Sequence, residues 1–385
     1  MTSFESTNSN SVEANGISLE IVNPNSMLFS TRVYPLPKNE LGATTNMEFT
    51  VRIINNTLNP IRLNPYQTFI PELLTADGQP LQKQIATVQP VSNTQTNENC
   101  SSIQHPHETR KFTQWEVKPE LPTTTSLTAK LSWHDNLLQL KIPTVPHFLL
   151  NSNNIWCFNL IESASYQFRF ILNTNHETTS IVESKRNEVK TAQPIGSEVV
   201  ATPWINLRLV QPVATDSSAI EIDGLQFKVE MPETVLTIPP RLPSAQTPVK
   251  LGIRVTNNTS AVLRFEQIGS LGFNLIDSDG KEIQFTEAQW RRWIDKGLEF
   301  YIVQPGESEI LVLDATLSWH CSQLQLVIPN KAGGFYYFRG LKQGRYQIQA
   351  IYHTSEHRAN YLNEKGVENV WSGWIAMPFV KFCIV

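Results

Sequence analysis

The chain has 385 residues, of which 17% are charged and 40% hydrophobic, and its formal net charge is −4. This length exceeds what one compact domain usually holds, so it predicts two domains. The negative balance excludes a general polyanion-binding protein, and a content of only 17 glycines excludes a collagen-like chain. Uncharged polar residues therefore carry much of the surface, which is typical of turns and of the solvent faces of sheets.

Residues 1–16 contain neither a basic region nor an apolar run of the kind found in a secretory signal, and we expect a disordered tail there. No apolar stretch reaches the length needed to span a bilayer, so we expect a cytoplasmic protein without membrane insertion. No cysteine occupies the same place in both copies of the repeat described next. This favours free thiols in a reducing compartment for Cys100, Cys157, Cys321 and Cys383.

The sequence contains an internal repeat. Phe49–Thr57 (FTVRIINNT) matches Leu251–Thr259 (LGIRVTNNT) at an offset of 202, and Leu131–Pro143 matches Leu317–Pro329 at an offset of 186. The matching blocks keep their order along the chain, which indicates a duplication. We therefore predict a first domain over residues 17–210, a linker over 211–221 and a second domain over 222–385.

Most matched blocks alternate between apolar and polar residues. In Phe49–Ile53, and again in Leu251–Val255, every second residue is apolar, as expected of half-buried strands. The segments between the blocks are rich in Asn, Asp, Gly and Pro, which are turn residues. Short strands separated by regular turns predict an all-β chain made of two tandem, duplicated, antiparallel β-sandwich domains.

The first copy has longer loops than the second. Later matches lie at offsets of 180 and 170, so the first copy carries 16, 6 and 10 extra residues in three places (202 − 186, 186 − 180 and 180 − 170). The largest insertion lies between Leu81 and Val117. Because long loops on a rigid framework often carry recognition, we expect this insertion, over Ile85–Glu108, to contact a partner.

Cys100, His105 and His107 lie together in that insertion. Thiolate and imidazole are zinc ligands, and this spacing offers three of them, but no fourth ligand is evident. Polar loops also carry histidines without metal, so we predict no metal site. His105 and His107 are instead candidate protein contacts.

Ser-Trp-His occurs twice, as Ser132-Trp133-His134 and Ser318-Trp319-His320. On a strand the serine and histidine share one face, but residues two apart rarely reach the geometry of a nucleophile and its base. Duplication is also expected of residues that determine the fold, so a buried tryptophan with a polar outer face is the favoured interpretation. No glycine-rich phosphate loop occurs. We predict a protein that is not an enzyme and has neither catalytic residues nor a cofactor.

Two segments of the second copy resemble known local motifs. Asp277–Glu282 begins like a calcium loop, but position 12 is Ala288, so a hairpin turn is predicted. In Thr286–Gly297 (TEAQWRRWIDKG), the spacing of Thr286 and Gln289 fits a capping box and Gly297 fits a stop, which predicts a short helix.

Trp290 and Trp293 would share one face of this helix, either covering a sheet edge, which is the favoured interpretation, or forming a ligand platform. Together with Arg291 and Arg292 they also have the composition of a single-stranded nucleic-acid site, which one patch on an acidic chain does not favour. These four residues are candidate protein contacts.

Several local segments of the two copies are typical of one known kind of domain. They are Phe69–Leu74 with Asp77-Gly78, Lys111–Gln114 and Val117–Glu120 in the first copy, and Phe273–Leu275 with Asp279-Gly280, Trp293–Phe300, Gln304–Glu307, Gly344–Tyr346 and Val370–Trp374 in the second. With these residues, each copy resembles a bacterial immunoglobulin-like sandwich and is similar to the intracellular proteinase inhibitor family (BsuPI). The first copy departs from the pattern at Pro119-Glu120, which lacks the glycine, and at Pro203, which precedes Trp204. The resemblance implies inhibition of an intracellular protease, and no reactive-site residue carries over to this chain.

We therefore expect a non-enzymatic protein that binds another protein, either as a binding module or as a scaffold. The partner is a protease if the chain shares the family's activity, and otherwise a subunit of an assembly. The alternatives are an intracellular protease inhibitor and a carbohydrate-binding module, which would need Trp371 and Trp374 exposed on one face. Nucleic acid is not an expected partner, and the sequence predicts no oligomeric state.

Overall fold

The computed structural model describes residues 12–14, 16–22, 31–40, 43–58, 60–63, 69–87, 115–119, 121–143, 154–160, 164–172, 179–180, 200–242, 244–266, 271–288, 300–330 and 334–385. The chain forms two compact units. Unit 1 comprises Met1–Ser30, Lys38–Ile161 and Ser165–Asn206, and unit 2 comprises Thr31–Pro37, Glu162–Ala164 and Leu207–Val385. Unit 2 thus includes Thr31–Pro37, a segment from within the predicted first domain.

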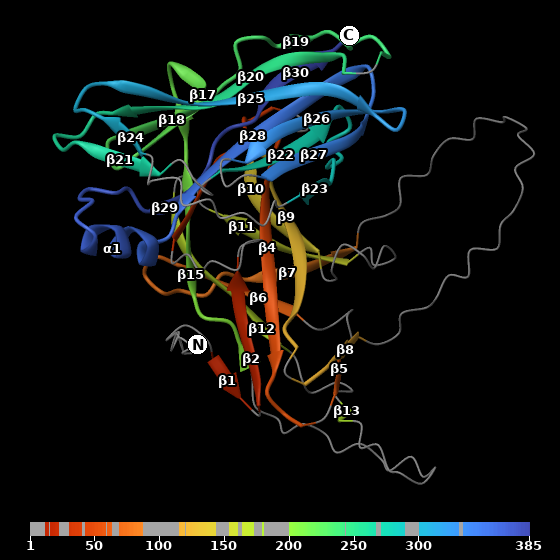
Figure 1. The fold of residues 1–385 in the computed structure, drawn as a ribbon. Helices are drawn as coiled ribbons and strands as arrows, with labels where there is room; N and C mark the ends of the chain where they lie inside the picture. The colour runs from red at the N-terminus through yellow and green to blue at the C-terminus, as the bar shows by residue number, and fades with distance from the viewer. Residues whose placement is uncertain are drawn as a thin grey trace, which may run out of the picture. The chain divides into compact units, whose positions relative to one another are not determined.

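Unit 1 is built on a seven-stranded antiparallel sheet. In spatial order its strands are β1 (Val12–Ala14), β2 (Ile17–Val22), β4 (Thr44–Asn55), β9 (Thr123–His134), β10 (Leu137–Pro143), β11 (Asn154–Leu160) and β7 (Lys83–Thr87) (Figure 1). In β4, Phe49, Val51 and Ile53 are buried while Glu48 and Arg52 are half-buried. The predicted alternation therefore directs the apolar face of this strand into the core.

A second set of strands completes the core of unit 1. β6 (Phe69–Thr75) and β14 (Val200–Ala201) both pair with β12 (Ser165–Leu172). The ring of Phe49 in β4 stacks on that of Phe168 in β12 at 4.5 Å and meets Phe170 edge-on at 6.0 Å. The short strands β5 (Ile61–Leu63), β8 (Trp115–Val117) and β13 (Thr179–Ser180) form a small separate sheet.

Unit 2 is built on an eight-stranded sheet. In spatial order its strands are β16 (Pro212–Val213), β17 (Asp216–Ile222), β18 (Leu225–Glu230), β20 (Gln246–Asn257), β25 (Ser308–His320), β26 (Gln323–Asn330), β27 (Gly334–Leu341) and β23 (Phe285–Ala288). β21 (Leu263–Glu266) and β24 (Phe300–Val303) form a separate antiparallel pair. β15 (Ile205–Val210) begins in unit 1 and ends in unit 2.

The second sheet of unit 2 is centred on β28 (Gly344–Thr354). β22 (Leu271–Asp277) pairs with one edge of β28, and β30 (Val380–Ile384) and β29 (Gly373–Ala376) pair with successive parts of the other edge. β19 (Val235–Leu236) lies parallel to β30, and β3 (Thr31–Pro35) lies parallel to β29. One buried cluster contains side chains of both sheets, including Phe227, Ile253, Leu313, Leu275, Ile348 and Phe382.

The two large sheets share their strand order and register. β2-β4-β9-β10-β11-β7 in unit 1 corresponds to β18-β20-β25-β26-β27-β23 in unit 2. Val51 pairs with Thr125 and Ile253 pairs with Leu311, so the pairings preserve the sequence offsets of 202 (253 − 51) and 186 (311 − 125). The predicted β-rich fold is confirmed, with antiparallel and mixed sheets. That the units are immunoglobulin-like sandwiches stays a prediction.

The repeated Asn-Asn-Thr segment is held in the same way in both units. Asn55 and Asn257 are fully buried. In unit 2 the Asn257 amide nitrogen donates to the carbonyls of Ala261 and Val303 at 2.7 and 3.0 Å, and its oxygen accepts from the amide and hydroxyl of Thr259 at 3.0 and 2.6 Å. The sequence analysis treated asparagines such as these as turn residues, but Asn55 and Asn257 have no positive φ and act as buried side-chain bridges.

A glycine faces each of these segments because the chain passes too close for a side chain. Gly16 and Gly224 have φ values of +72° and +78°, and a Cβ atom would lie 2.7 and 3.0 Å from the methyl carbons of Thr57 and Thr259. Asn56 and Asn258 donate backbone hydrogen bonds to the carbonyls of the two glycines at 2.7 and 2.8 Å. Only glycine combines this backbone conformation with this close approach.

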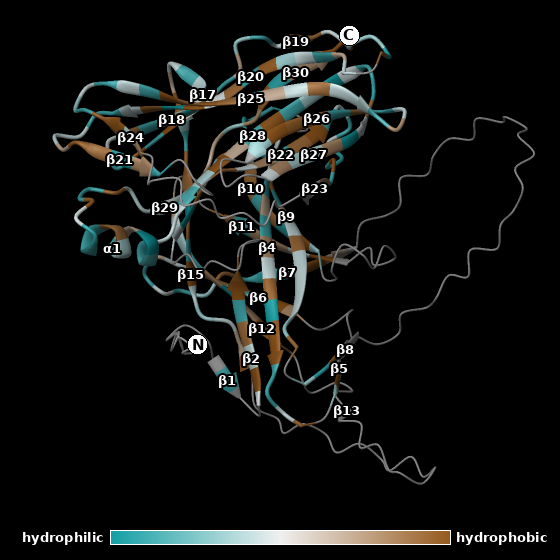
Figure 2. Cartoon of the chain, viewed as in Figure 1, coloured by the Kyte–Doolittle hydropathy of each residue, from teal (hydrophilic) through white to brown (hydrophobic). Residues whose placement is uncertain are grey.

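The prediction of a helix over Thr286–Gly297 is wrong for its first residues, which form a strand. Thr286 lies in β23, which pairs with β27, and Gln289 onward lies outside the described residues. In the described part of the chain the one α-helix is α1 (Glu356–Glu364), whose N-cap Ser355 accepts a hydrogen bond from the amide of Arg358 at 3.2 Å. Helix α1 has nine residues and is mostly hydrophilic (Figure 2), and no described helix is long and apolar enough to cross a membrane.

Candidate functional site

The last strand of the unit 1 sheet, β7, presents an open edge. It pairs with β11 on one side, and among the described residues no strand pairs with its other side. The side chains of Lys83, Gln84 and Ile85 are exposed, that of Ile85 to 62%, and Ala86 is half-buried. The Lys83 ammonium lies 5.4 Å from the centre of the Trp156 ring. An open edge with an exposed apolar side chain is a template for adding another strand.

The equivalent edge of unit 2 differs in its side chains. Lys83 pairs with Phe158, and Phe285 of β23 pairs with Phe338, so the two strands have the same register. In β23 the half-buried Phe285 packs on Phe338 at 5.8 Å, whereas the same position of β7 carries lysine. Two residues further on, unit 1 has Ile85 where unit 2 has glutamate. The exposed apolar residue is therefore particular to the edge in unit 1.

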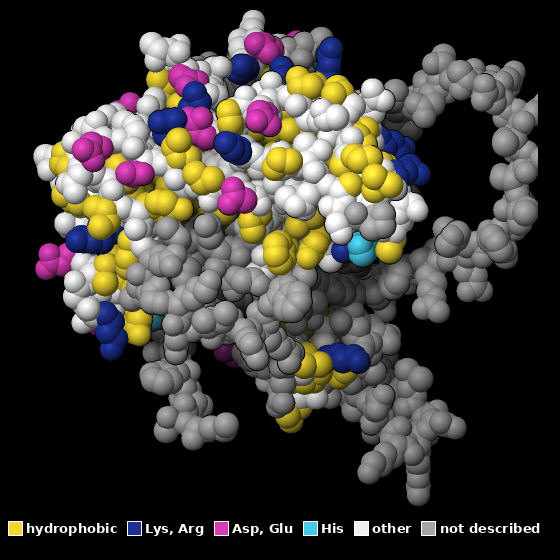
Figure 3. All heavy atoms as spheres, turned by 45° about the horizontal axis from the view of Figure 1, so that its top comes forward, with side chains coloured by type: hydrophobic (Ala, Val, Ile, Leu, Met, Phe, Trp, Pro, Cys, Tyr) yellow, Lys and Arg dark blue, Asp and Glu magenta, His cyan; other side chains and the backbone are white. Residues whose placement is uncertain are grey.

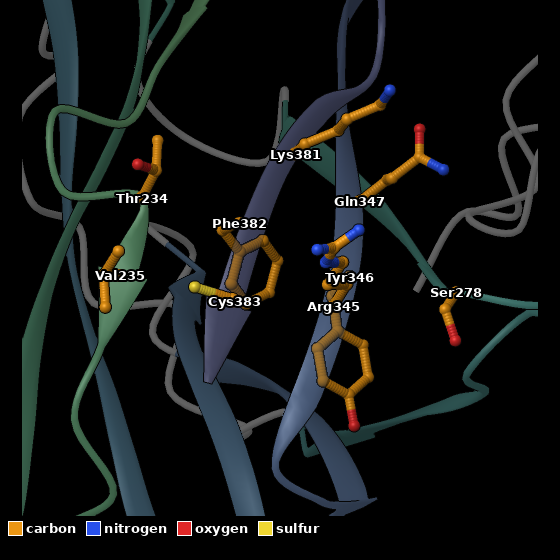
Figure 4. A pocket seen from close by; sticks show the side chains of 9 residues that line it. All are labelled: Thr234, Val235, Ser278, Arg345, Tyr346, Gln347, Lys381, Phe382 and Cys383. Carbon is orange, nitrogen blue, oxygen red and sulfur yellow. The ribbon is translucent and has the colours of Figure 1, made fainter. Parts of the chain in front are cut away.

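A shallow pocket of about 480 Å³ lies on the second sheet of unit 2 (Figure 4). Arg345 of β28, Cys383 of β30 and Val235 of β19 stand in one row across three strands, and Gln347 pairs with Lys381 in the next row. Tyr346 and Phe382 alternate with these residues and stack in the core at 5.6 Å. The same alternation that buries the two rings therefore turns the polar side chains outward.

The two cations of the pocket are uncompensated. Arg345 and Lys381 are exposed, and neither forms an ion pair within the described part of the chain. By contrast, five other arginines are paired with carboxylates, namely Arg52, Arg169, Arg208, Arg254 and Arg358. Arg345 and Lys381 are polar members of alternating strands, but no local pattern in the sequence shows that they are neighbours, so they were not predicted as a site.

The duplicated Ser-Trp-His motifs lie at the ends of hairpin strands. His134 and His320 are exposed, and no hydrogen bond joins serine to histidine in either motif, all six residues of which the structure describes. Trp319 is half-buried, its indole nitrogen donates to the carbonyl of Pro239 at 2.8 Å, and the Arg241 guanidinium lies 4.3 Å from its ring. Both tryptophans are half-buried rather than buried as predicted.

Asp277 organises a tight turn. Its carboxylate accepts hydrogen bonds from the backbone amides of Asp279 and Lys281 at 3.0 and 2.9 Å, and its own amide donates to the carbonyl of Lys281 at 3.0 Å. In a calcium loop this Asp277 carboxylate oxygen would bind the metal, whereas here it accepts hydrogen bonds from backbone amides. This confirms the predicted turn.

Several predicted site residues lie outside the described residues. They are Cys100, His105, His107, Trp290, Arg291, Arg292 and Trp293. The other three cysteines carry free thiols: Cys321 is exposed, while Cys157 and Cys383 are half-buried. Burial raises the pKa of Cys157, against the smaller opposite effect of the Lys141 charge.

The two tryptophans expected to be exposed on one face are packed instead. Trp374 is 6% exposed and its ring lies 4.7 Å from that of Tyr34. Trp371 is half-buried against the core and lies 5.3 Å from the ring of Tyr352. The expectation of an exposed aromatic pair is therefore wrong, and the carbohydrate-binding alternative loses the residues that suggested it.

A buried titratable group lies beside Trp374 in unit 2. His353 of β28 pairs with Trp374 of β29 and is 7% exposed. Burial lowers the pKa of His353 to about 4, and the positive charge of the buried Arg32 lowers it further. Folded unit 2 therefore holds this imidazole neutral at neutral pH.

We expect unit 2 to lose stability as the pH falls from about 6.5 to about 4. In this window the unfolded chain binds a proton at His353 that the folded chain does not, which lowers the free energy of unfolding by up to about 3 kcal/mol. Urea titrations over this range test the expectation. His353→Gln should flatten the profile, whereas His357→Gln, on the exposed surface of α1, should leave it unchanged. Equal profiles for His353→Gln and the wild type would contradict the assignment.

No protein-family model and no curated protein matches the chain.

Proposed function

We propose that the chain is a non-enzymatic protein-binding protein, built from two tandem immunoglobulin-like β-sandwiches, in which a partner adds a strand to the open edge of β7. The observation that carries the proposal is the exposed edge itself, with Ile85 62% exposed in the middle of the strand. An added strand would satisfy the outward backbone groups of β7 and cover the isoleucine.

The comparison between units supports a specific role for this edge. Natural sheets protect open edges with charged side chains, and glutamate occupies the position of Ile85 in unit 2. In unit 1 the charged residue is Lys83, two positions earlier, and Ile85 is the first residue of the insertion that was predicted to contact a partner. The rest of that insertion, from residue 88 onward, lies outside the described residues.

The test compares capture of partners by the full chain and by Ile85→Glu, which copies the residue of unit 2. The matched control is Leu121→Glu, which replaces a 60% exposed leucine of the same unit outside β7. Affinity purification from the native lysate with quantitative mass spectrometry should show a partner reduced about tenfold by Ile85→Glu and retained by the control. Equal capture by all three chains, with unchanged circular dichroism, would refute strand addition at β7.

The resemblance to intracellular proteinase inhibitors makes a cytosolic protease the first partner class to assay. If the partner is a protease, the full chain should slow its hydrolysis of a peptide substrate, and Ile85→Glu should relieve the inhibition. A captured partner without protease activity would assign the chain to the scaffold class instead.

A further inference from the structure

We propose that the pocket on the second sheet of unit 2 binds an acidic, extended segment of a protein partner, with Arg345 and Lys381 receiving its carboxylates. This goes beyond strand addition at β7 and does not depend on it, because every residue involved belongs to unit 2. The two proposals are therefore tested separately.

The arrangement of the polar side chains favours an extended ligand. Thr234 directly precedes β19, Lys381 lies in β30, Gln347 lies in β28 and Ser278 directly follows β22, with Arg345 between them (Figure 4). Four neighbouring strands span about 14 Å, which is the length of about four residues of extended chain. A single small anion would need donors that converge on one point, and these donors are instead spread over neighbouring strands and two rows of the sheet (Figure 4).

The charges favour acidic side chains in that ligand. Cys383 pairs with Arg345, and Lys381 lies two residues before Cys383 on the same strand, so the two cations are diagonal neighbours. Such neighbours lie about 7–8 Å apart, close enough to repel each other and to be bridged by two carboxylates. In the turn that contains Ser278, the Asp277 carboxylate accepts from backbone amides, and the Asp279 carboxylate accepts from the Ser278 hydroxyl at 3.4 Å.

The pocket also offers an apolar contact. Val235 is 58% exposed at the edge of the row that contains Cys383 and Arg345. A peptide with an aliphatic side chain next to its acids would cover this valine. A polyanion such as nucleic acid would need a wider basic surface than the two cations of this lining. Figure 3 shows one face of the molecule, on which Lys and Arg side chains are mixed with Asp, Glu and apolar ones.

The test uses the full chain and a fluorescein-labelled synthetic peptide, Glu-Val-Glu-Glu-Val-Glu, followed by fluorescence anisotropy at low salt. The peptide should bind, and the double variant Arg345→Gln/Lys381→Gln should weaken binding about tenfold. The matched control is Lys250→Gln/Lys365→Gln, which removes two exposed lysines of unit 2 outside the pocket and should change affinity less than twofold. Raising the salt should weaken wild-type binding more than binding by the pocket variant.

Three results would overturn the proposal. The first is no binding of the peptide, and the second is equal weakening by both double variants. The third is complete displacement of the peptide by inorganic phosphate or by a single-stranded oligonucleotide at a lower concentration than unlabelled peptide. None of these outcomes bears on capture through β7, where Ile85→Glu is the variant.

Discussion

Replacing Asn257 with alanine is expected to lower the free energy of unfolding of unit 2 by about 3 kcal/mol. Asn257 is fully buried and makes four hydrogen bonds, to Ala261, Val303 and both donors of Thr259. Alanine would leave the buried carbonyl of Val303 and the amide and hydroxyl of the half-buried Thr259 without this partner, and the cost of burying unpaired groups exceeds the worth of the bonds themselves.

Urea titration with pulsed hydrogen exchange and mass spectrometry measures this effect in peptides from β20 and β25. The neighbouring Asn258 is exposed, so Asn258→Ala should change stability by less than about 0.5 kcal/mol. Asn55→Ala should produce the corresponding loss in β4 and β9 of unit 1, where Asn55 accepts from Thr57 and donates to Val117. Similar effects of Asn257→Ala and Asn258→Ala would contradict the role given to the buried amide.

Phe265→Ala is expected to destabilise unit 2 by about 3–5 kcal/mol. The side chain is fully buried, and its ring lies 6.1, 5.8 and 6.0 Å from those of Phe227, Tyr352 and Trp371. Truncation would remove buried apolar area and leave a cavity among three large rings, which cannot close together without moving β18 and β28.

The same exchange experiment separates this cavity effect from a general loss of hydrophobicity. Phe265→Leu keeps most of the volume and should cost less than about 1.5 kcal/mol. Leu242→Ala, at a position that is 65% exposed, should cost almost nothing. A loss with Phe265→Ala no larger than with Leu242→Ala would show that the aromatic cluster does not hold unit 2 together.

The regular alternation of apolar and polar residues made the strands predictable. The internal repeat made it predictable which strand of unit 1 corresponds to which strand of unit 2. The offsets of 202 and 186 between the copies reappear as equal registers of β4 on β9 and β20 on β25. What the repeat could not predict was the position of β3. Thr31–Pro35 pairs in parallel with β29, more than 300 residues away in the chain (375 − 33), and no local pattern encodes such a contact.

The helix error has a physical explanation. Thr286 and Gln289 satisfy a local capping rule, but cross-strand pairing of β23 with β27 decides the structure at Thr286. The signals at α1 were equally local and were overlooked: Ser355 caps the N-terminus, and Gly366 follows the last turn with a φ of +83°. Both cases show that capping signals are informative only where no strand partner competes for the segment.

The candidate sites were only partly accessible from the sequence. Ile85 was included in the insertion expected to contact a partner, but its place at an open edge depends on the order of seven strands. The alternation of apolar and polar residues predicts that Arg345 and Lys381 each lie on an outer face. It does not predict that they are neighbours, which follows only from the pairing of β28 with β30. Trp371 and Trp374 are close in the sequence but do not form one exposed pair, because Trp371 packs on the core and Trp374 packs beside Tyr34.

The most direct test of the central claim is hydrogen exchange of the full chain with and without its captured partner, read in the peptide that covers β7. Strand addition predicts that the partner slows exchange of the outward amides of Lys83–Thr87 and leaves β23 of unit 2 unchanged. Protection confined to other segments, with β7 exchanging as fast as in the free chain, would contradict binding at this edge.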